Sequence, residues 1–310
     1  MRVASLFAGI GGIDLAFEQV GHEVVWANEN NKYAVKTYKR NFRNVFVDER
    51  DIKNIPTTEI PNMDILTAGF PCQSFSVMGY QRGFKDPRGN LFFEIARIVD
   101  EKKPQIIFLE NVRNLLKHDN GKTFKIIHNT LVALGYYTKY KVMSPHEYVD
   151  IPQKRERIFI VAFKDLAMYD AFEFPETMPL TKTINDIIDR TERHHDIYYY
   201  TDKSKYYRLL DERMTDKGVV YRIDDWGVAH EKWEICPTLK ANMGTYPDRV
   251  PVIIDDFGIR KLTPYECLKF QGFPESFKFP NIPLHEIYKQ CGNTVCVETV
   301  VSAIKHISAC

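Results

Sequence analysis

Residues 2–12 read RVASLFAGIGG, a largely apolar run that leads directly into a glycine-rich turn. The apolar part predicts a buried β-strand, and the residues that follow, Ile13–Val20, have the pattern of a helix. Glycines at such a turn let the backbone approach a ligand closely, and the first N–H groups of the helix can bind an anion. Because tight turns also use glycine for conformational reasons alone, this turn indicates a ligand site only together with later motifs.

Strand-like and helix-like segments alternate to about residue 163. Further strands are expected at Glu23–Ala27, Val45–Val47, Asp64–Ala68, Ile106–Glu110 and Arg157–Phe163, and further helices at Tyr33–Asn41, Leu91–Lys102 and Thr123–Leu134. Gly21 and Gly135 stand where two of the helices should end. Nearly continuous apolar strands are typical of parallel sheets, so we predict a doubly wound, mostly parallel α/β sheet of the Rossmann-like kind.

The pattern changes after about residue 165. Residues 166–256 are irregular and rich in Tyr, Asp, Lys and Arg, which indicates a smaller, strand- and loop-rich unit. Helical signals return where Thr263 can cap a helix and Glu266 can act as the reciprocal partner, and a last helix is expected from about Thr294 to Ile307. We therefore expect residues 1–165 and 259–310 to form one domain and residues 166–258 a second.

Composition sets broad limits. The chain of 310 residues is 44% hydrophobic and 13% aromatic, which is typical of a folded protein with a sizeable core. It has no apolar stretch of the roughly 20 residues that a membrane span needs, and its N-terminus begins with a strand rather than a signal peptide, so a soluble cytoplasmic protein is expected. The net charge of +1 neither supports nor excludes nucleic acid. The six cysteines show no Cys-x-x-Cys pair and no completing histidines, so no metal site is expected.

One cysteine stands just past a predicted strand, in the stretch GFPCQ of residues 69–73. Glu110 ends the next strand, and carboxyl ends of strands line the ligand crevice of an open α/β sheet, so Cys72 and Glu110 should face the same crevice. A carboxyl group at the end of an apolar strand can stay protonated, and a thiolate beside a proton donor suits nucleophilic catalysis. Residues 73–89 are long for a connection and predict a binding loop, although a disordered surface loop would also explain their glycines.

Two acidic residues follow the second and third strands. Glu29 stands where a carboxylate can hold a ribose diol, and Asp51 could accept a hydrogen bond from an adenine amino group. Either one alone would more often be an ordinary surface residue. Their order after successive strands indicates a nucleoside-containing cofactor.

Four motifs occur together and in a fixed order: GFPCQ (69–73), ENV (110–112), QKRER (153–157) and QCGNTV (290–295). With the glycine-rich turn, they make the sequence resemble the bacterial C5-cytosine DNA methyltransferases of type II restriction–modification systems, especially those of the HhaI type. The resemblance extends from Ser5 to about Val300 and is weakest after residue 165.

The resemblance implies a role for each matching residue. It implies S-adenosylmethionine as cofactor, Cys72 as nucleophile, Glu110 as the group that binds ring nitrogen 3 and the exocyclic amine, and Arg155 as the group that orients the flipped base. The cofactor-binding residues would be Phe7, Gly9, Gly11, Gly12, Glu29, Asp51, Ile52, Asn293 and Val295. The DNA-binding residues would be Gln73, Ser76, Arg82, Arg88, Arg157, Thr238, Asn242 and Gly244, with residues 166–258 as the target recognition domain. The partners would be double-stranded DNA and a cognate endonuclease, and a monomer is expected.

The implied reaction is methylation of carbon 5 of cytosine after Cys72 attacks carbon 6, which requires the base to rotate out of the duplex. A tRNA cytosine methyltransferase is the first alternative, but that branch usually has Pro-Pro-Cys and a Cys-Phe-Thr signature, whereas this chain has Phe70-Pro71-Cys72 and no Cys-Phe-Thr. A non-catalytic DNA-binding relative would be expected to lose Cys72 or Glu110. A small-molecule methyltransferase would not need the large polar segment after residue 165.

Overall fold

The computed structural model describes residues 1–70, 91–223, 232–245 and 248–307. The chain forms two compact units: Met1–Met143, Glu156–Pro175 and Val300–Cys310 make the first, and Ser144–Arg155 and Glu176–Thr299 make the second. Residues 259–299 thus group with the second unit. The expected division into a catalytic domain of residues 1–165 with 259–310 and a target recognition domain of residues 166–258 stays a prediction.

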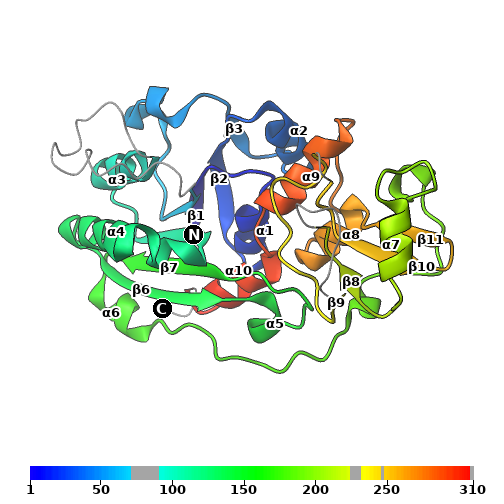
Figure 1. The fold of residues 1–310 in the computed structure, drawn as a ribbon. Coiled ribbons are helices and arrows are strands. Elements are labelled where there is room, and N and C mark those ends of the chain that lie inside the picture. The colour runs from blue at the N-terminus through cyan, green and yellow to red at the C-terminus, as the bar shows by residue number, and fades with distance from the viewer. Residues whose placement is uncertain (71–90, 224–231, 246–247, 308–310) are drawn as a thin grey trace. The chain divides into compact units, whose positions relative to one another are not determined.

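The first unit is built on a seven-stranded sheet in the order β3-β2-β1-β4-β5-β7-β6 (Figure 1). Its strands are β1 (Arg2–Leu6), β2 (Glu23–Asn28), β3 (Phe46–Asp48), β4 (Ile65–Gly69), β5 (Ile106–Val112), β6 (Tyr137–Met143) and β7 (Arg157–Phe163). The pairs from β3 to β5 are parallel, whereas β7 runs antiparallel to both β5 and β6. The predicted mostly parallel sheet is confirmed. Only β6 was not expected.

Four helices of the first unit begin and end close to their predicted bounds: α1 (Gly12–Gln19), α2 (Lys32–Asn41), α3 (Leu91–Lys102) and α4 (Lys122–Ala133). Helix α6 (Leu166–Ala171) was not expected, and α10 (Val297–Ile304) begins in the second unit and ends in the first. Gly21 and Gly135 have φ angles of +89° and +86°, the left-handed conformation that ends a helix. Asn31 caps α2 by accepting hydrogen bonds from the N–H groups of Tyr33 and Ala34.

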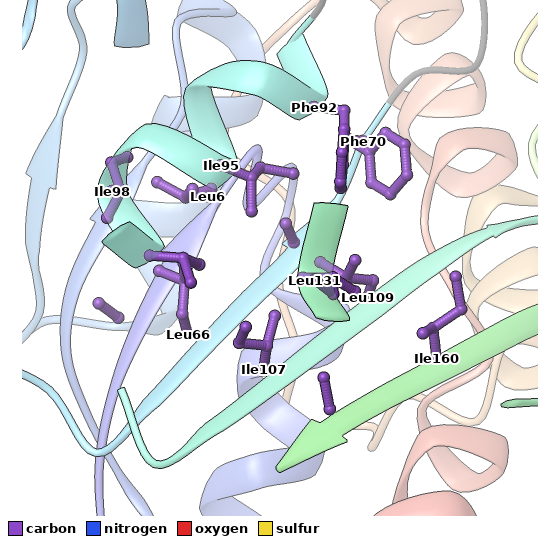
Figure 2. Packing of buried hydrophobic residues seen from close by; sticks show 14 of the residues in the cluster. Leu6, Leu66, Phe70, Phe92, Ile95, Ile98, Ile107, Leu109, Leu131 and Ile160 are labelled. Atoms are coloured by element: carbon purple, nitrogen blue, oxygen red, sulfur yellow. The ribbon is translucent and has the colours of Figure 1, made fainter. Parts of the chain in front are cut away.

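A hydrophobic core fixes the carboxyl ends of the central strands. Figure 2 shows Leu66 of β4 and Leu109 of β5 packed with Ile95 and Phe92 of α3, all fully buried. Phe70, which directly follows β4, is 3% exposed, and its ring centroid lies 5.9 Å from that of Phe92. Burying each such side chain contributes about 1.5–3 kcal/mol, so the end of β4 is held firmly in place.

The second unit contains a four-stranded antiparallel sheet in the order β11-β10-β8-β9. Its strands are β8 (Val220–Tyr221), β9 (Lys232–Trp233), β10 (Val252–Asp255) and β11 (Gly258–Lys261), and its helices are α5 (Pro145–Tyr148), α7 (Tyr207–Arg213), α8 (Pro264–Phe270) and α9 (Leu284–Asn293). Short 3₁₀ helices over both units span Ile52–Asn54, Thr57–Glu59, Arg113–Leu116, His118–Gly121, Ile184–Asp186 and Asp196–Tyr198. The capping box of Thr263 and Glu266 opens α8 as predicted, whereas α9 was not expected and α10 is shorter than predicted.

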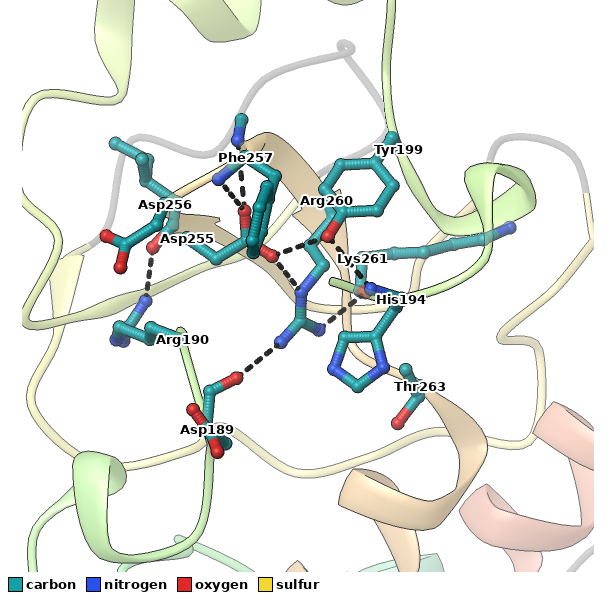
Figure 3. Close-up of polar contacts among 12 residues, drawn as sticks. Asp189, Arg190, His194, Tyr199, Asp255, Asp256, Phe257, Arg260, Lys261 and Thr263 are labelled. Carbon is teal, nitrogen blue, oxygen red and sulfur yellow. Dashed lines mark hydrogen bonds and ion pairs between the residues drawn. The ribbon is translucent and has the colours of Figure 1, made fainter. Parts of the chain in front are cut away.

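A buried cation holds the β10–β11 hairpin to α8. Arg260 is 0% exposed, and its Nε donates to Asp255 Oδ2 at 2.6 Å (Figure 3). Its two terminal nitrogens donate to the two oxygens of Glu266 at 2.8 Å each. The same guanidinium donates to the carbonyl oxygen of Asp189 at 3.3 Å. A buried charge is tolerated only when it is paired in this way, so Arg260 fixes the packing of this unit. In the described part of the chain, no helix is long and apolar enough to cross a membrane.

Candidate active site

The glycine-rich turn after β1 adopts a strained, open conformation. Phe7, Gly9 and Gly11 have φ angles of +55°, +59° and +89°. A left-handed conformation costs a residue with a side chain about 1–2 kcal/mol, so Phe7 is held there by its surroundings. At Gly9 no described atom lies within 4 Å of where a Cβ would be, whereas at Gly11 a Cβ would lie 2.2 Å from Cε2 of Phe42. The backbone at Gly9 therefore faces open space, and Gly11 is required by packing.

Glu29 fastens this turn to the start of α2. Its Oε2 accepts a hydrogen bond from the Gly9 N–H at 2.9 Å, and its Oε1 accepts one from the Asn31 N–H at 2.7 Å. A carboxylate oxygen can accept two hydrogen bonds, so each oxygen of Glu29 has capacity for one more donor. Two such acceptors on one carboxylate suit the two hydroxyls of a ribose diol.

Asn28, the last residue of β2, positions the segment that carries Asp51. Its Nδ2 donates to the carbonyl oxygens of Asp48 and Arg50 at 3.0 and 2.9 Å. Asp51 follows directly with an exposed side chain, and Ile52 beside it is 2% exposed. Sequence reasoning missed Asn28, although a buried asparagine at the end of an apolar strand is a signal that could have revealed it.

Arg97 of α3 supports the same segment from the other side of the turn. Its Nη2 donates to the carbonyl oxygens of Ile52 and Ile55 at 3.2 and 3.1 Å, and its Nε donates to Glu94 at 2.8 Å. This arginine was not predicted either. Its position within an amphipathic helix gives no hint of partners some 45 residues earlier.

At the end of the neighbouring strands, Glu110 lies beside the start of the GFPCQ motif. Glu110 pairs with Gly69 in the β4–β5 register, and a Cβ at Gly69 would lie 3.4 Å from Glu110 Oε2. The next residue, Asn111, is buried and donates from Nδ2 to the carbonyl oxygen of Phe70 at 2.7 Å. Asn111 therefore holds the chain two residues before Cys72. Cys72 lies outside the described residues, as do Gln73, Ser76, Arg82 and Arg88.

Arg157, at the start of β7, forms an ion pair with Glu110. Its Nε lies 3.1 Å from Glu110 Oε1, and the two side chains are only 13% and 12% exposed. Burial lowers the pKa of Arg157, and the charge of Glu110 opposes that shift. The protonated state expected of Glu110 stays a prediction.

Arg155, which sequence reasoning assigned to the flipped base, has different surroundings. It is 2% exposed, and its guanidinium donates to the carbonyl oxygens of Leu239, Gly292 and Thr294 at 2.8, 3.0 and 2.5 Å. Arg155 belongs to the second unit and Arg157 to the first. Arg157 thus forms an ion pair with Glu110, whereas Arg155 donates hydrogen bonds to backbone carbonyl oxygens.

Residues 236–245, here named the 236–245 loop, contain the predicted DNA contacts Thr238, Asn242 and Gly244. Cys236 N–H donates to the carbonyl oxygen of Pro152 at 2.7 Å, and Thr238 Oγ1 donates to that of Lys154 at 2.7 Å. At the other end of the loop Gly244 has a φ of +77°, and a Cβ there would lie 3.0 Å from Cα of His285. The loop is therefore fixed at both ends within the second unit.

Comparison with known proteins decides the family. The model of the C-5 cytosine-specific DNA methylases matches residues 1–309. The chain belongs to this family. This methylase is 49% identical over 303 residues to the type II methyltransferase M.Bsp6I of a Bacillus strain, covering 97% of this chain and 96% of that protein. It is 39% identical to M.HhaI of Haemophilus parahaemolyticus, covering 97% of this chain and 92% of that protein.

Solved structures of low sequence identity share the fold of the methylase. A mutant of Spodoptera frugiperda DNMT2 superimposes with a TM-score of 0.78 at 20% identity, covering 99% of both chains. A putative DNA modification methyltransferase encoded within a prophage of E. coli gives 0.74 at 20% identity, covering 100% of this chain and 99% of that chain. These likenesses confirm the Rossmann-like methyltransferase fold that the strand pattern predicted.

The methylase structure thus groups the predicted residues unevenly. The turn of residues 7–12 is joined directly to Glu29, and Gly69 of the cysteine motif is paired with Glu110. Asn293 is exposed and Val295 is 6% exposed, and both belong to the second unit. Their expected contact with the cofactor stays a prediction, as do the individual DNA contacts.

Proposed function

We propose that this methylase transfers a methyl group to carbon 5 of a flipped-out cytosine in a specific duplex DNA sequence, as the modification half of a restriction–modification system. The observation that carries the proposal is the pairing of Gly69 with Glu110 together with the bond from Asn111 to Phe70. Through them, a half-buried carboxylate stands at the point from which the chain enters the stretch containing Cys72. Nearly full-length identity of 49% to a type II methyltransferase supports a DNA substrate over RNA.

S-adenosylmethionine, when bound, supplies the methyl group. The residues present fit this cofactor, because Glu29 has acceptor capacity for a ribose diol and the backbone at Gly9 faces open space. Glu29 would hold the ribose and Asp51 the adenine amino group, with the ring of Phe7 stacking on adenine. Gly11, Gly12 and Ile52 would shape the surrounding backbone, and Asn293 and Val295 are further proposed contacts.

Cys72 is proposed to attack carbon 6 of the cytosine as a thiolate. The new sulfur–carbon bond moves the electron pair of the 5,6 double bond toward carbon 5 and makes that carbon nucleophilic. Glu110 is proposed to bind ring nitrogen 3 and the exocyclic amine. After methyl transfer, loss of the carbon-5 proton restores the double bond as the sulfur–carbon bond breaks.

Arg157 is proposed to orient the base together with Glu110. The ion pair at 3.1 Å keeps the carboxylate in one orientation, and a guanidinium has five N–H donors, so donors remain for an oxygen of the base. This role was expected of Arg155 from sequence. We assign it to Arg157 because the carboxylate expected to bind the base pairs with that residue.

The base must leave the duplex before Cys72 can reach it, at a cost of a few kcal/mol. Gln73, Ser76, Arg82 and Arg88 after the cysteine motif, and Thr238, Asn242 and Gly244 in the 236–245 loop, are the proposed DNA contacts that offset this cost. A cognate endonuclease would cut the sequence that the methylase protects.

A covalent trap tests this proposal. Bisulfite sequencing of DNA from cells that express the methylase gives the recognition sequence, and duplexes carrying 5-fluorocytosine at the target are then incubated with enzyme and cofactor. Fluorine cannot leave as a proton does, so an adduct at Cys72 should accumulate and be mapped by mass spectrometry. Cys72→Ala should abolish both adduct and methyl transfer while cofactor and DNA binding remain.

Cys267→Ala is the matched control, because Cys267 is a fully buried thiol on α8. This variant should still form the adduct. Turnover by Cys72→Ala, or an active wild-type enzyme that forms no adduct, would refute the mechanism. If parallel assays show methylation of tRNA but not of duplex DNA, the substrate is tRNA and the proposed DNA substrate is wrong.

A further inference from the structure

Arg155 is a buried cation that joins backbone carbonyl groups of two segments. At 2% exposure, it donates to three backbone carbonyl oxygens, one from Leu239 and two from Gly292 and Thr294. Burying a charge is costly unless its hydrogen bonds are made, and these three carbonyl oxygens accept hydrogen bonds from the Arg155 guanidinium. Such an arrangement is stable only where the guanidinium fork fits the positions of the carbonyls.

The carbonyls that Arg155 joins lie on two segments far apart in sequence. Leu239 belongs to the 236–245 loop, and Gly292 and Thr294 flank the C-terminal end of α9. The two segments also touch directly, because a Cβ at Gly292 would lie 2.1 Å from the carbonyl oxygen of Lys240. Only glycine permits this approach, so the middle of the loop rests on the backbone of residue 292.

The segment before Arg155 completes the attachment. Lys154 N–H donates to the carbonyl oxygen of Cys236 at 2.9 Å, and Thr238 Oγ1 returns a hydrogen bond to the carbonyl oxygen of Lys154 at 2.7 Å. Residues 152–155 therefore hold the first half of the loop by its backbone. Of the side chains of the loop, those of Leu239 and Met243 are buried, whereas Lys240, Ala241 and Thr245 are exposed.

We propose that Arg155 is a positioning residue for sequence recognition, which fixes the backbone of the 236–245 loop against residues 292–294. This inference rests on the proposed function, in which the loop contacts DNA. Discrimination between bases depends on the placement of a few donors and acceptors to a fraction of an ångström. A loosened loop would accept DNA sequences that the wild-type enzyme rejects, while the reaction at Cys72 and Glu110 would continue.

Arg155→Lys tests this role because it keeps the charge but removes the fork. A single ammonium nitrogen cannot reach carbonyls on both segments with the geometry of a planar guanidinium. Bisulfite sequencing of genomic DNA methylated in vitro should then show methylation at sites that differ from the wild-type consensus by one base. We expect the ratio of kcat/KM on consensus DNA to that on such near-consensus DNA to fall by about tenfold or more, the contribution of one good base contact.

Arg155→Lys should leave the rate of the methyl-transfer step nearly unchanged. With a saturating consensus duplex, kcat and the yield of the 5-fluorocytosine adduct should stay within a fewfold of wild type while KM for DNA rises. Arg260→Lys is the matched control, because Arg260 is a fully buried arginine of the same unit whose described partners, Asp189, Asp255, Lys261 and Glu266, lie outside the loop. It should lower the melting temperature without changing the set of methylated sites.

Gly292→Ala provides a second variant, because it keeps the carbonyl oxygen that accepts from Arg155 but places a methyl group against the backbone of Lys240. It should relax the recognition sequence in the same way. If Arg155→Lys abolishes adduct formation with an unchanged site pattern, Arg155 acts on the base and the inference is overturned. If Arg155→Lys changes specificity no more than Arg260→Lys does, the inference is also overturned although the proposed function stands. A wild-type enzyme that methylates no DNA overturns both.

Discussion

Gly11 is the position at which the structure makes its most quantitative prediction. A Cβ at this residue would lie 2.2 Å from Cε2 and 2.6 Å from Cζ of Phe42, and the φ of +89° is unfavourable for any side chain. The left-handed backbone costs alanine about 1–2 kcal/mol, and forcing a methyl group into packed space costs about 1–3 kcal/mol more. Alanine also lowers the conformational entropy of the unfolded chain, which stabilises the folded protein by about 0.4–1 kcal/mol. Gly11→Ala should therefore lower the free energy of unfolding by about 1–5 kcal/mol, with a central value of about 3 kcal/mol.

A comparison with Gly21 separates the cost of the left-handed backbone from the cost of overlap with Phe42. Gly21 has the same φ of +89°, but no described atom lies within 4 Å of where its Cβ would be. Gly21→Ala should thus report the backbone cost alone, about 1 kcal/mol after the gain from the unfolded chain. The difference between the two variants measures the overlap with Phe42.

Urea unfolding followed by circular dichroism gives these free energies, and isothermal titration with S-adenosylmethionine gives the effect on the turn. We expect Gly11→Ala to weaken cofactor binding at least tenfold and Gly21→Ala to leave it unchanged. In a Phe42→Leu background, which removes Cε2 and Cζ, the cost of Gly11→Ala should shrink toward that of Gly21→Ala. Equal costs for Gly11→Ala and Gly21→Ala in the wild-type background would show that Phe42 does not confine the turn.

Three further predictions concern side chains that support the site. Burial raises the pKa of Asp14 from 3.8 to about 6, so as pH rises from about 4 to 6 the wild-type enzyme should lose about 2 kcal/mol of stability relative to Asp14→Asn, out of about 3 kcal/mol over the whole titration. Unfolding curves at several pH values check this, and parallel pH profiles of the two proteins would contradict it. Arg157→Met removes the partner of Glu110 and should lower single-turnover methyl transfer at least about 100-fold with cofactor affinity retained, whereas a change of less than threefold would rule out its proposed role. Arg97→Met removes a donor to the carbonyl oxygen of Ile52 and should raise the Kd for S-adenosylmethionine about tenfold, and an unchanged titration would exclude it as a support of the cofactor segment.

Elements whose residues are buried in a regular pattern could be predicted from sequence. The bounds of β7 and α3 agree with the prediction to the residue, because one is a continuous apolar run and the other has an unbroken amphipathic pattern. By contrast, β6 reads Tyr-Thr-Lys-Tyr-Lys-Val-Met and is an edge strand whose side chains are mostly half-buried or exposed. Its pairing with β7, rather than its composition, makes it a strand, and pairing is a tertiary property.

The same distinction explains what sequence revealed about the site. Glu110 could be placed beside the cysteine motif because it stands in an apolar strand next to the one that leads to Cys72, and the two strands pair with Glu110 opposite Gly69. Arg155 and Arg157 stand two residues apart in one motif, and no local pattern distinguishes them. One donates to carbonyls contributed by residues 239, 292 and 294, and the other meets a carboxylate 47 positions earlier. The two arginines fall in different compact units, because the chain passes from one unit to the other between residues 155 and 156, and sequence alone does not reveal that crossing point.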